Sequence, residues 1–218
     1  MAEVRKRSPR RRRRGAPLVI ERELWAQGLE LVAGVDEAGR GPLAGPVVAA
    51  AVIFRPEERV VGVTDSKQLT PEVREELVVE IRRRALVIGV GAASCREVDR
   101  LNILRASHLA MKRAIARLDP LPEHVLVDGL PVPELGPGHT AIVDGDAKSF
   151  TIACASIVAK TVRDRLMHRL AARYPGYGWE TNVGYGTPEH VAALTDFGPT
   201  PHHRRSFVPV QLSLDLWD

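Results

Sequence analysis

The sequence predicts an α/β fold, with helices flanking a central sheet. Short apolar runs typical of buried strands alternate along the chain with longer segments of helical periodicity. At 218 residues, 44% hydrophobic and 27% charged, the chain suits one domain with a substantial core. No apolar run approaches the roughly 18 residues of a membrane helix, and no secretory signal is visible. We therefore expect a cytoplasmic protein without a membrane segment.

The first half of the chain contains three predicted strands, at residues 31–35, 47–54 and 86–93. An amphipathic helix is expected at 18–29. A second helix should run from Thr70 to about Arg84, because Thr70 can cap it and Pro71 suits its first position. The segment 94–118 reads as helical with a break near Asn102, and the segment 64–69 reads as a polar loop.

The second half contains short strands at 125–127 and 140–143, separated by a proline-rich loop. A long helix is expected over 149–174, because apolar residues recur every four positions and define a buried stripe. A glycine- and aromatic-rich loop follows at 174–186, and a second Thr-Pro-Glu sequence at Thr187 opens a helix to about Phe197. Cys95 and Cys154 are expected to be small core residues in a reducing compartment.

The net charge of +4 is distributed unevenly. Residues 1–16 contain eight Lys and Arg against one acid, a charge of +7, which leaves −3 for the rest of the chain. Such a block of like charges predicts a disordered Arg-rich tail. The tail either is a solvated leader or adds salt-dependent contacts to nucleic-acid phosphates.

Acidic residues follow three of the predicted strands: Asp36 with Glu37, Asp128, and Asp146 at a helix entry. Carboxylates that converge at strand ends can bind hard cations such as Mg²⁺. Two ions about 3.5–4 Å apart can stabilise the attacking and leaving oxygens of a phosphodiester. An isolated acid such as Asp128 is, however, more often a turn-forming residue.

Several longer motifs are more specific. GVDEAGRGPLAGPVVAAAV, DSKQLT, NILRASHLAMKRAI, VDG, GDAKSFTIACASIVAKTVRDRLM, NVGYGTPEH and HHRRSFVPV resemble the ribonuclease HII family (type 2 ribonuclease H), in order from about residue 30 to 210. The resemblance implies a ribonuclease-H-like fold with a central mixed sheet, flanking helices and a C-terminal helical extension. We expect a single catalytic domain over 17–210.

By this resemblance, four acids form the catalytic, metal-binding set: Asp36, Glu37, Asp128 and Asp146. Asp144 competes with Asp146, which is preferred for its spacing to SFTIACASIVAK. Asp164 is expected to pair with Lys160 at i,i+4. The implied cofactor is a pair of Mg²⁺ or Mn²⁺ ions. Neighbouring residues of a strand point to opposite faces, so Glu37 reaches the site only if the chain bends at Ala38-Gly39 or through its backbone.

The resemblance also implies substrate-binding residues. Gly39, Arg40 and Gly41 would read the 2′-hydroxyl, which distinguishes RNA from DNA, although such a triplet alone would suggest a tight turn. Tyr185 would pack on the next deoxyribose, against the alternative of a loop aromatic that covers the core. Ser66 and Lys67 resemble the family's phosphate-contacting pair. Apart from the resemblance, a second pair, Lys160 with Arg163, lies one helical turn apart and could add contacts to the nucleic-acid backbone. For the second pair, a solvated helix face is an equal alternative.

The implied activity is cleavage of the RNA strand of RNA–DNA hybrids and of the bond 5′ of a ribonucleotide embedded in duplex DNA, in replication and repair. QLSLDL, in the tail at 211–218, resembles a peptide that docks on the bacterial sliding clamp in extended form. Alternatively, its leucines alternate into the protein's own surface as a strand. Nothing in the sequence demands more than a monomer.

Three other classes remain as alternatives. Ribonuclease HIII carries a large N-terminal binding domain, whereas only about 30 residues precede the first motif here. A non-catalytic nucleic-acid binder would not need the four acids. A metal-dependent phosphatase or exonuclease would not explain the Gly-Arg-Gly triplet together with the tyrosine loop.

Overall fold

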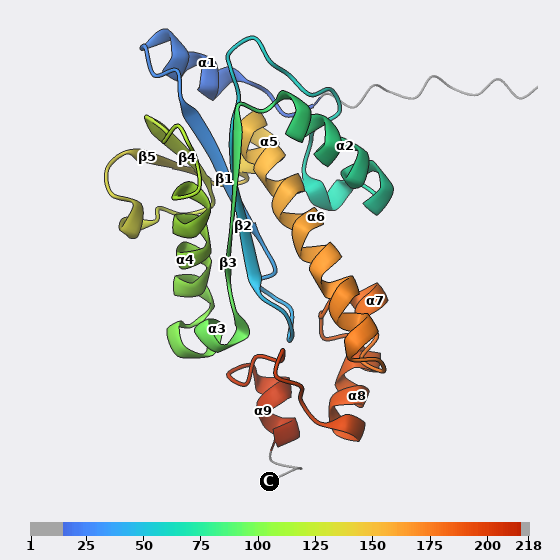
Figure 1. The fold of residues 1–218 in the computed structure, drawn as a ribbon. Helices are drawn as coiled ribbons and strands as arrows, with labels where there is room; N and C mark the ends of the chain where they lie inside the picture. Colours follow the sequence, from blue (N-terminus) through green and yellow to red (C-terminus); the bar gives the residue numbers. More distant parts are fainter. Residues whose placement is uncertain (1–14, 215–218) are drawn as a thin grey trace, which may run out of the picture.

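The structure, a computed structural model, describes residues 15–214. Residues 1–14 and 215–218 lie outside this part, and so do most of the predicted Arg-rich tail and the end of the predicted C-terminal tail. The described residues form a central sheet covered by helices on both faces (Figure 1). The predicted α/β fold with a mixed sheet is thereby confirmed.

The sheet has five strands in the order β3-β2-β1-β4-β5. The central strand β1 pairs antiparallel with β2 and parallel with β4, while β2–β3 is antiparallel and β4–β5 parallel. Their bounds are β1 Val32–Ala38, β2 Val47–Ile53, β3 Val87–Ala93, β4 His124–Asp128 and β5 His139–Ile142. Because β1 and β4 run in the same direction, their carboxyl ends meet at one edge of the sheet.

Helices alternate with these strands as predicted, and the short ones lie in the loops. The helices are α1 Val19–Ala26, α2 Pro71–Arg84, α3 Cys95–Leu101, α4 Ile103–Ile115, α5 Gly145–Lys148, α6 Phe150–Arg173, α7 Trp179–Asn182, α8 Pro188–Phe197 and α9 Val208–Leu214. Two 3₁₀ turns, η1 Ser66–Gln68 and η2 Pro133–Leu135, lie within the predicted loops. No helix in the described part of the chain is long and apolar enough to cross a bilayer.

Local sequence explains where several helices begin. Thr70 and Thr187 cap α2 and α8, with their hydroxyls accepting hydrogen bonds from the N–H groups of Val73 (3.4 Å) and His190 (3.3 Å). The break predicted near Asn102 separates α3 from α4, and Asn102 has a positive φ of 68°. Each of these capping contacts joins residues only three positions apart, which is why the sequence alone could locate the helix starts.

The sheet has two apolar faces because β2 is buried on both sides. Ala50 and Val52 of β2 face the core beneath α6, whereas Ala49, Ala51 and Ile53 face the core beneath α4. This alternation follows from the period of two along a strand. Cys154 and Cys95 are buried and free of disulfide bonding, consistent with the prediction of small core residues.

Helix α6 lies unusually close to the sheet at Gly34 of β1. A Cβ atom placed on Gly34 would come within 3.0 Å of backbone atoms of Thr151 and Ile152, in the first turn of α6. Only the absence of a side chain allows this approach. Gly34 therefore sets the distance between β1 and the helix that follows Asp146.

The first turn of α6 is also held from the N-terminal side of the chain. Glu21 of α1 is fully buried, and its Oε1 accepts hydrogen bonds from the Ser149 hydroxyl (2.6 Å) and from the N–H and hydroxyl of Thr151 (both 2.9 Å). A carboxylate is favoured at this helix N-terminus because the N–H groups there lack partners within the helix. Glu21 thus anchors α1 to the start of α6.

Beyond the far end of α6, helices α7–α9 form a separate small cluster (Figure 1). Its core contains Met167, Trp179, Leu194 and Val210. The predicted C-terminal helical extension is present. The alternative of a surface strand at residues 211–214 is wrong, however, because these residues belong to helix α9, with Ser213 buried. The extended form was expected of the docked segment and stays a prediction. The alternating leucines suggested a strand because so short a run cannot distinguish the period of two in a strand from the period of 3.6 in a helix.

Candidate active site

The predicted acids meet at the shared edge of β1 and β4. In the parallel register Val35 is opposite Val127, the last pair between β1 and β4, and Asp36 and Asp128 are the next residues on the two strands. Asp36 is buried, at 5% exposure, and Asp128 is half-buried. The strand pairing places both carboxyl groups at one edge without any contribution from loops.

Glu37 lies beside them although it follows Asp36 directly. Pairing of β1 with β2 continues through Ala38, and the chain bends at Gly39, whose φ is +94°. Glu37 accepts a hydrogen bond from Arg40 Nη1 at 3.2 Å, while its second oxygen, Oε2, is buried without a partner in the described structure. A buried, unpaired carboxylate oxygen is an available ligand for a cation.

Asp146 is supplied by the short helix α5. Its predecessor Gly145 donates its N–H to Asp128 Oδ1 at 2.6 Å, which joins α5 to the end of β4. Asp146 is nearly buried, whereas Asp144 is exposed, has a positive φ of 55° and makes no capping hydrogen bond. This placement agrees with the preference for Asp146, which remains a prediction.

The acids raise one another's pKa values. Burial raises the pKa of Asp36 well above its usual range, and the neighbouring Glu37 and Asp128 add to it. Burial likewise raises the pKa of Glu37, against the effect of Arg40. For Asp146 the upward shift comes from burial, then from Asp65 and Asp128. Such mutual destabilisation of the charged forms is relieved by a bound cation.

A loop carrying Lys67 faces the same group. Burial lowers the pKa of Lys67, but the nearby carboxylates of Asp146, Asp65 and Asp36 outweigh it, and the net shift is upward. Ser66 is buried and its hydroxyl lies 2.9 Å from that of Ser156 on α6. The loop therefore places one cationic side chain against the acids.

A hollow of about 310 Å³ opens over these residues. The predicted site residues that line it are Asp36, Glu37, Gly39, Arg40, Gly41, Ser66, Lys67, Asp128, Lys160 and Tyr185. Asp146 lies beside it, next to Lys67 and Asp128. The structure thus brings together residues that are up to 149 positions apart in the chain, as the resemblance implied.

Arg163 is the exception among the predicted site residues. It is fully buried, and its guanidinium donates to the carbonyls of Pro46 (3.1 Å), Val183 (3.0 Å) and Ala44 (3.0 Å). Neither the phosphate contact nor the solvated helix face considered from the sequence describes this position. A charged residue in a helix is ordinarily exposed, and only the tertiary fold shows the carbonyls that receive it.

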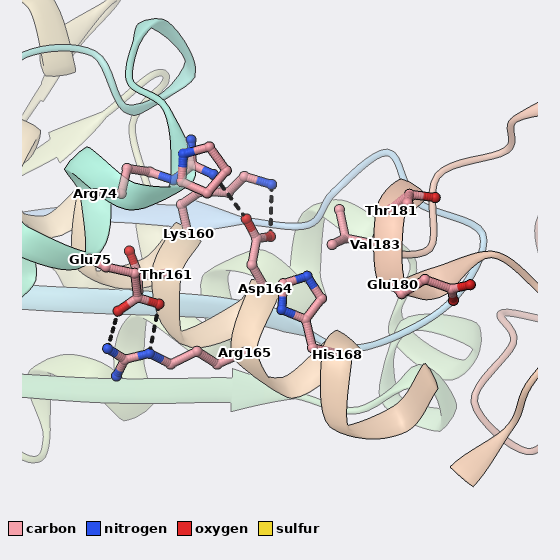
Figure 2. Close-up of a pocket in the computed structure, with 11 residues that line it drawn as sticks. Arg74, Glu75, Lys160, Thr161, Asp164, Arg165, His168, Glu180, Thr181 and Val183 are labelled. Carbon is pink, nitrogen blue, oxygen red and sulfur yellow. Dashed lines mark hydrogen bonds and ion pairs between the residues drawn. The ribbon is translucent and has the colours of Figure 1, made fainter. Parts of the chain in front are cut away.

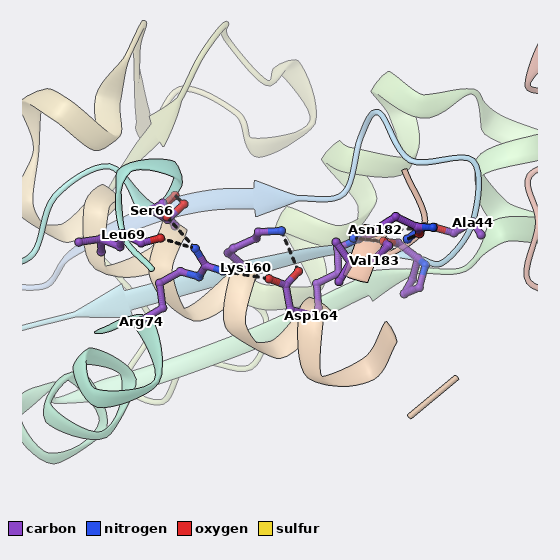
Figure 3. A network of polar contacts seen from close by, with 12 residues as sticks. Ala44, Ser66, Leu69, Arg74, Lys160, Asp164, Asn182 and Val183 are labelled. Atoms are coloured by element: carbon purple, nitrogen blue, oxygen red, sulfur yellow. Dashed lines mark hydrogen bonds and ion pairs between the residues drawn. The ribbon is translucent and has the colours of Figure 1, made fainter. Parts of the chain in front are cut away.

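Lys160 separates the hollow from a second pocket of about 330 Å³ between α2, α6 and α7 (Figure 2). Its Nζ donates to Asp164 at 2.8 Å, which confirms the predicted i,i+4 pair, and lies 5.9 Å from the ring centre of Tyr185. Arg74 joins Asp164 (3.3 Å) to the carbonyls of Ser66 and Leu69 (Figure 3). This network connects the Ser66–Lys67 loop to α6, and sequence reasoning assigned no role to Arg74.

Tyr185 is held from behind by a buried histidine pair. The N–H of Thr200 donates to His203 Nδ1 (2.9 Å), so His203 carries its proton on Nε2 and donates it to His190 Nε2 (2.9 Å). The indole N–H of Trp179 also donates to His190 Nε2, at 3.1 Å. His190 therefore carries its proton on Nδ1 and donates to the carbonyl of Tyr185 at 2.8 Å. This directed chain requires both histidines to be neutral.

The histidine pair predicts a loss of stability in acid. Burial and the neighbouring His190 lower the pKa of His203 to about 3, against about 6.5 in the unfolded chain. As the pH falls below about 6.5, the unfolded chain binds a proton that the folded chain refuses until pH 3. His203 then costs about 1.4 kcal/mol of stability per pH unit. Urea unfolding at pH 7, 6 and 5 should show a shallower pH slope for His203→Asn than for the parent chain; equal slopes would contradict the assignment.

Comparisons with known proteins agree with this geometry. A model of the family described as ribonuclease HII matches residues 33–210. Ribonuclease HII of Geobacillus thermodenitrificans is 54% identical over 196 residues, which cover 90% of this chain and 75% of that protein.

Solved structures share the fold. The ribonuclease H2 of Pyrococcus horikoshii OT3 has a TM-score of 0.73 at 28% identity, covering 85% of this chain and 98% of that one. The PCNA:RNase HII complex of Archaeoglobus fulgidus gives 0.70 at 31% identity, covering 81% and 95%. The family match at residues 33–210 includes all the residues that form the candidate site. The chain therefore belongs to the ribonuclease HII family, whose members are metal-dependent endonucleases that act on RNA–DNA hybrids.

Proposed function

We propose that, besides RNA–DNA hybrids, this chain cuts the phosphodiester bond on the 5′ side of a single ribonucleotide embedded in duplex DNA, leaving a 3′-hydroxyl and a 5′-phosphate. It would act as a monomer in the removal of ribonucleotides during replication and repair. The observation that carries the proposal is that Asp36, the Gly39–Gly41 triplet and Tyr185 line one hollow. Groups suited to hydrolysis and groups suited to reading a sugar lie side by side.

The donor chemistry of the site fits hard divalent ions. Carboxylates are the ligands that Mg²⁺ and Mn²⁺ prefer. Within the described part of the chain, the Oε2 atom of Glu37 has no hydrogen-bond partner, and the raised pKa values of Asp36 and Asp146 show that their charged forms lack a neutralising cation there. Among residues 15–214 no three His, Cys, Asp or Glu side chains are already arranged as a ligand set. Oxygens of Asp36 and Asp128 instead accept 2.6 Å hydrogen bonds from the N–H groups of Glu37 and Gly145.

In this proposal Asp36, Glu37, Asp128 and Asp146 would hold the ions. Two ions held in this way would activate a water molecule and stabilise the leaving 3′-oxygen. The chain's own residues orient the substrate. Lys67 offers its ammonium to a phosphate next to the acids, and the exposed ring of Tyr185, 45% accessible, offers a face to a sugar.

The test uses four duplexes of one sequence: all DNA, one ribonucleotide, four ribonucleotides and a full RNA–DNA hybrid. With Mg²⁺ or Mn²⁺, denaturing gels should show one cut 5′ of the single ribonucleotide, no cut in all-DNA duplex and no cut in EDTA. Cleavage of the hybrid without any cut at the single ribonucleotide would contradict the proposal. Phosphatase and ligase treatment of the products identifies the two ends.

We further propose that the chain's C-terminal segment docks on a sliding clamp. The related ribonuclease HII of Archaeoglobus fulgidus was solved in a complex with PCNA, which supports the proposal. Leu212 is 61% exposed in α9, so part of the segment is accessible. Pull-down with a bacterial sliding clamp should recover the full chain but not a chain that lacks residues 210–218; equal recovery would reject docking through this segment.

A further inference from the structure

Two buried arginines hold the loop that connects β1 to β2. Arg163 and Arg204 are both fully buried, yet neither forms an ion pair with a carboxylate in the described part of the chain. Instead their guanidinium groups donate to backbone carbonyls of this loop. Burying a guanidinium without a counter-charge is costly. The hydrogen bonds to the loop carbonyls therefore have to compensate for the cost of burying these two charges.

Arg204 reaches the loop from the C-terminal segment, 159–165 positions away in sequence. Its Nη2 donates to the carbonyl of Gly39 (2.5 Å) and its Nη1 to that of Arg40 (2.8 Å). Its Nε and Nη2 also donate to the carbonyl of Gly45, at 3.1 and 2.9 Å. One planar group thereby joins the two ends of the loop. Arg163 supports the other side, because a Cβ on Gly39 would collide with its guanidinium.

The orientation of the carbonyls determines the orientation of the amides. In a planar trans peptide the C=O and the N–H of the next residue point in opposite directions. Because Arg204 draws the carbonyls of Gly39 and Arg40 inward, the N–H groups of Arg40 and Gly41 point away from it. Within residues 15–214 neither N–H has a hydrogen-bond acceptor.

The residues that carry these two amides line the hollow of the candidate site. Gly39, Arg40 and Gly41 line it together with Tyr185. A Cβ placed on Gly41 would lie 3.6 Å from Tyr185 Cε1, so the triplet and the tyrosine ring are adjacent. Unsatisfied N–H groups next to a ring are suited to an oxygen on a sugar that stacks there.

We propose that Arg204 is a positioning residue that presents the amides of Arg40 and Gly41 to the 2′-hydroxyl of the ribonucleotide. It acts through the loop and does not touch the substrate itself. The inference rests on the proposed reading of a single ribonucleotide and adds the residue that gives the reading loop its orientation. A lysine would keep the charge but has no fork to bind several carbonyls at once.

The first experiment compares binding of two duplexes that differ by one 2′-hydroxyl. In the Asp36→Asn background, which prevents cleavage, Kd is measured with Mg²⁺ for a duplex with one ribonucleotide and for the all-DNA duplex. Arg204→Lys should lower the preference for the ribonucleotide about tenfold, the value of one well-placed hydrogen bond. A global loss of affinity would weaken both duplexes and leave the ratio unchanged.

Arg74→Lys is the matched control. Arg74 is also buried and also donates to backbone carbonyls, but to those of Ser66 and Leu69 in another loop. Its substitution should affect both duplexes alike. A parent protein without any preference would reject the proposed function. A preference that survives Arg204→Lys in a folded protein would reject the role of Arg204 alone.

A second measurement needs no substitution at Arg204. In the unaltered chain without metal, amide hydrogen exchange by NMR should be fast at Arg40 and Gly41, because neither N–H has an acceptor. The duplex with one ribonucleotide should slow exchange at both amides, and all-DNA duplex should not. Slow exchange in the free protein, or equal protection by the two duplexes, would overturn the inference.

Discussion

Asp36→Asn is expected to lower the cleavage rate by at least about 10³-fold while leaving substrate binding intact. Asp36 is the buried carboxylate of β1 just beyond the pairing with β4, next to Glu37 and Asp128. In the proposed mechanism, loss of this charged ligand would remove several kcal/mol of transition-state stabilisation by the ions, and each 1.4 kcal/mol is tenfold in rate. Single-turnover cleavage of a hybrid under saturating enzyme measures this step.

The fold should survive this substitution. Asn retains the carbonyl oxygen that accepts the N–H of Glu37 at 2.6 Å. Because burial and neighbouring acids raise the pKa of Asp36, its charge opposes folding at pH 7 when no ion is bound. The variant should therefore be at least as stable as the parent in EDTA. If the four acids hold Mg²⁺ as proposed, Mg²⁺ should raise the melting temperature of the parent chain, and Asp36→Asn should lose this gain.

Asp144→Asn provides the matched control. Asp144 lies two residues before Asp146 but is exposed, and Asn tolerates its positive φ. It should cleave at the parent's rate, within about twofold. If Asp144→Asn lost activity and Asp36→Asn kept it, the assignment of the acids would be wrong.

Gly34→Ala is expected to destabilise the fold by about 3 kcal/mol, at the upper end for overpacking by a methyl group. The added Cβ would meet backbone atoms of Thr151 and Ile152, which no change of side-chain conformation can move. Helix α6 would have to withdraw from the sheet. Since Asp146 precedes this helix and Ser156 lies within it, activity should fall too.

The midpoint of urea unfolding, with an unchanged m-value, measures this loss. Gly138→Ala is the control, because a Cβ there has no atom within 4 Å and its φ lies outside the left-handed region. Its stability should change by less than about 0.5 kcal/mol. Equal midpoints for the two variants would show that α6 is not pressed against β1 as tightly as the geometry indicates.

Sequence reasoning recovered what neighbouring residues determine. The helix starts at Thr70 and Thr187 and the break at Asn102 depend on caps and turns, and the structure confirms all three. The grouping of the acids and of Tyr185 was implied by long motifs. No local pattern could provide it, because the residues come from separate strands and loops.

What sequence reasoning missed depends on distant contacts. Arg163 and Arg204 are buried against carbonyls of the β1–β2 loop. The positions of these carbonyls are known only from the tertiary structure, so the sequence could not predict either contact. The motif HHRRSFVPV did contain Arg204 and His203, but a motif alone gives no partner. The strand alternative for residues 211–214 was wrong because seven residues of mixed character carry too weak a period to distinguish helix from strand.

The contact of Glu21 with Ser149 and Thr151 has a consequence for how the protein is made. The two sides of this contact are 128–130 residues apart, so the ribosome has produced α1 long before the group it binds exists. Until then the Glu21 side chain, which is buried in the folded protein, remains exposed to water. The junction of α5 and α6, which carries Asp146, can form its contact with Glu21 only after α6 has been synthesised. A shortened chain that starts at β1 would keep all four acids of the candidate site. It would lack Glu21, the carboxylate that binds the first turn of α6.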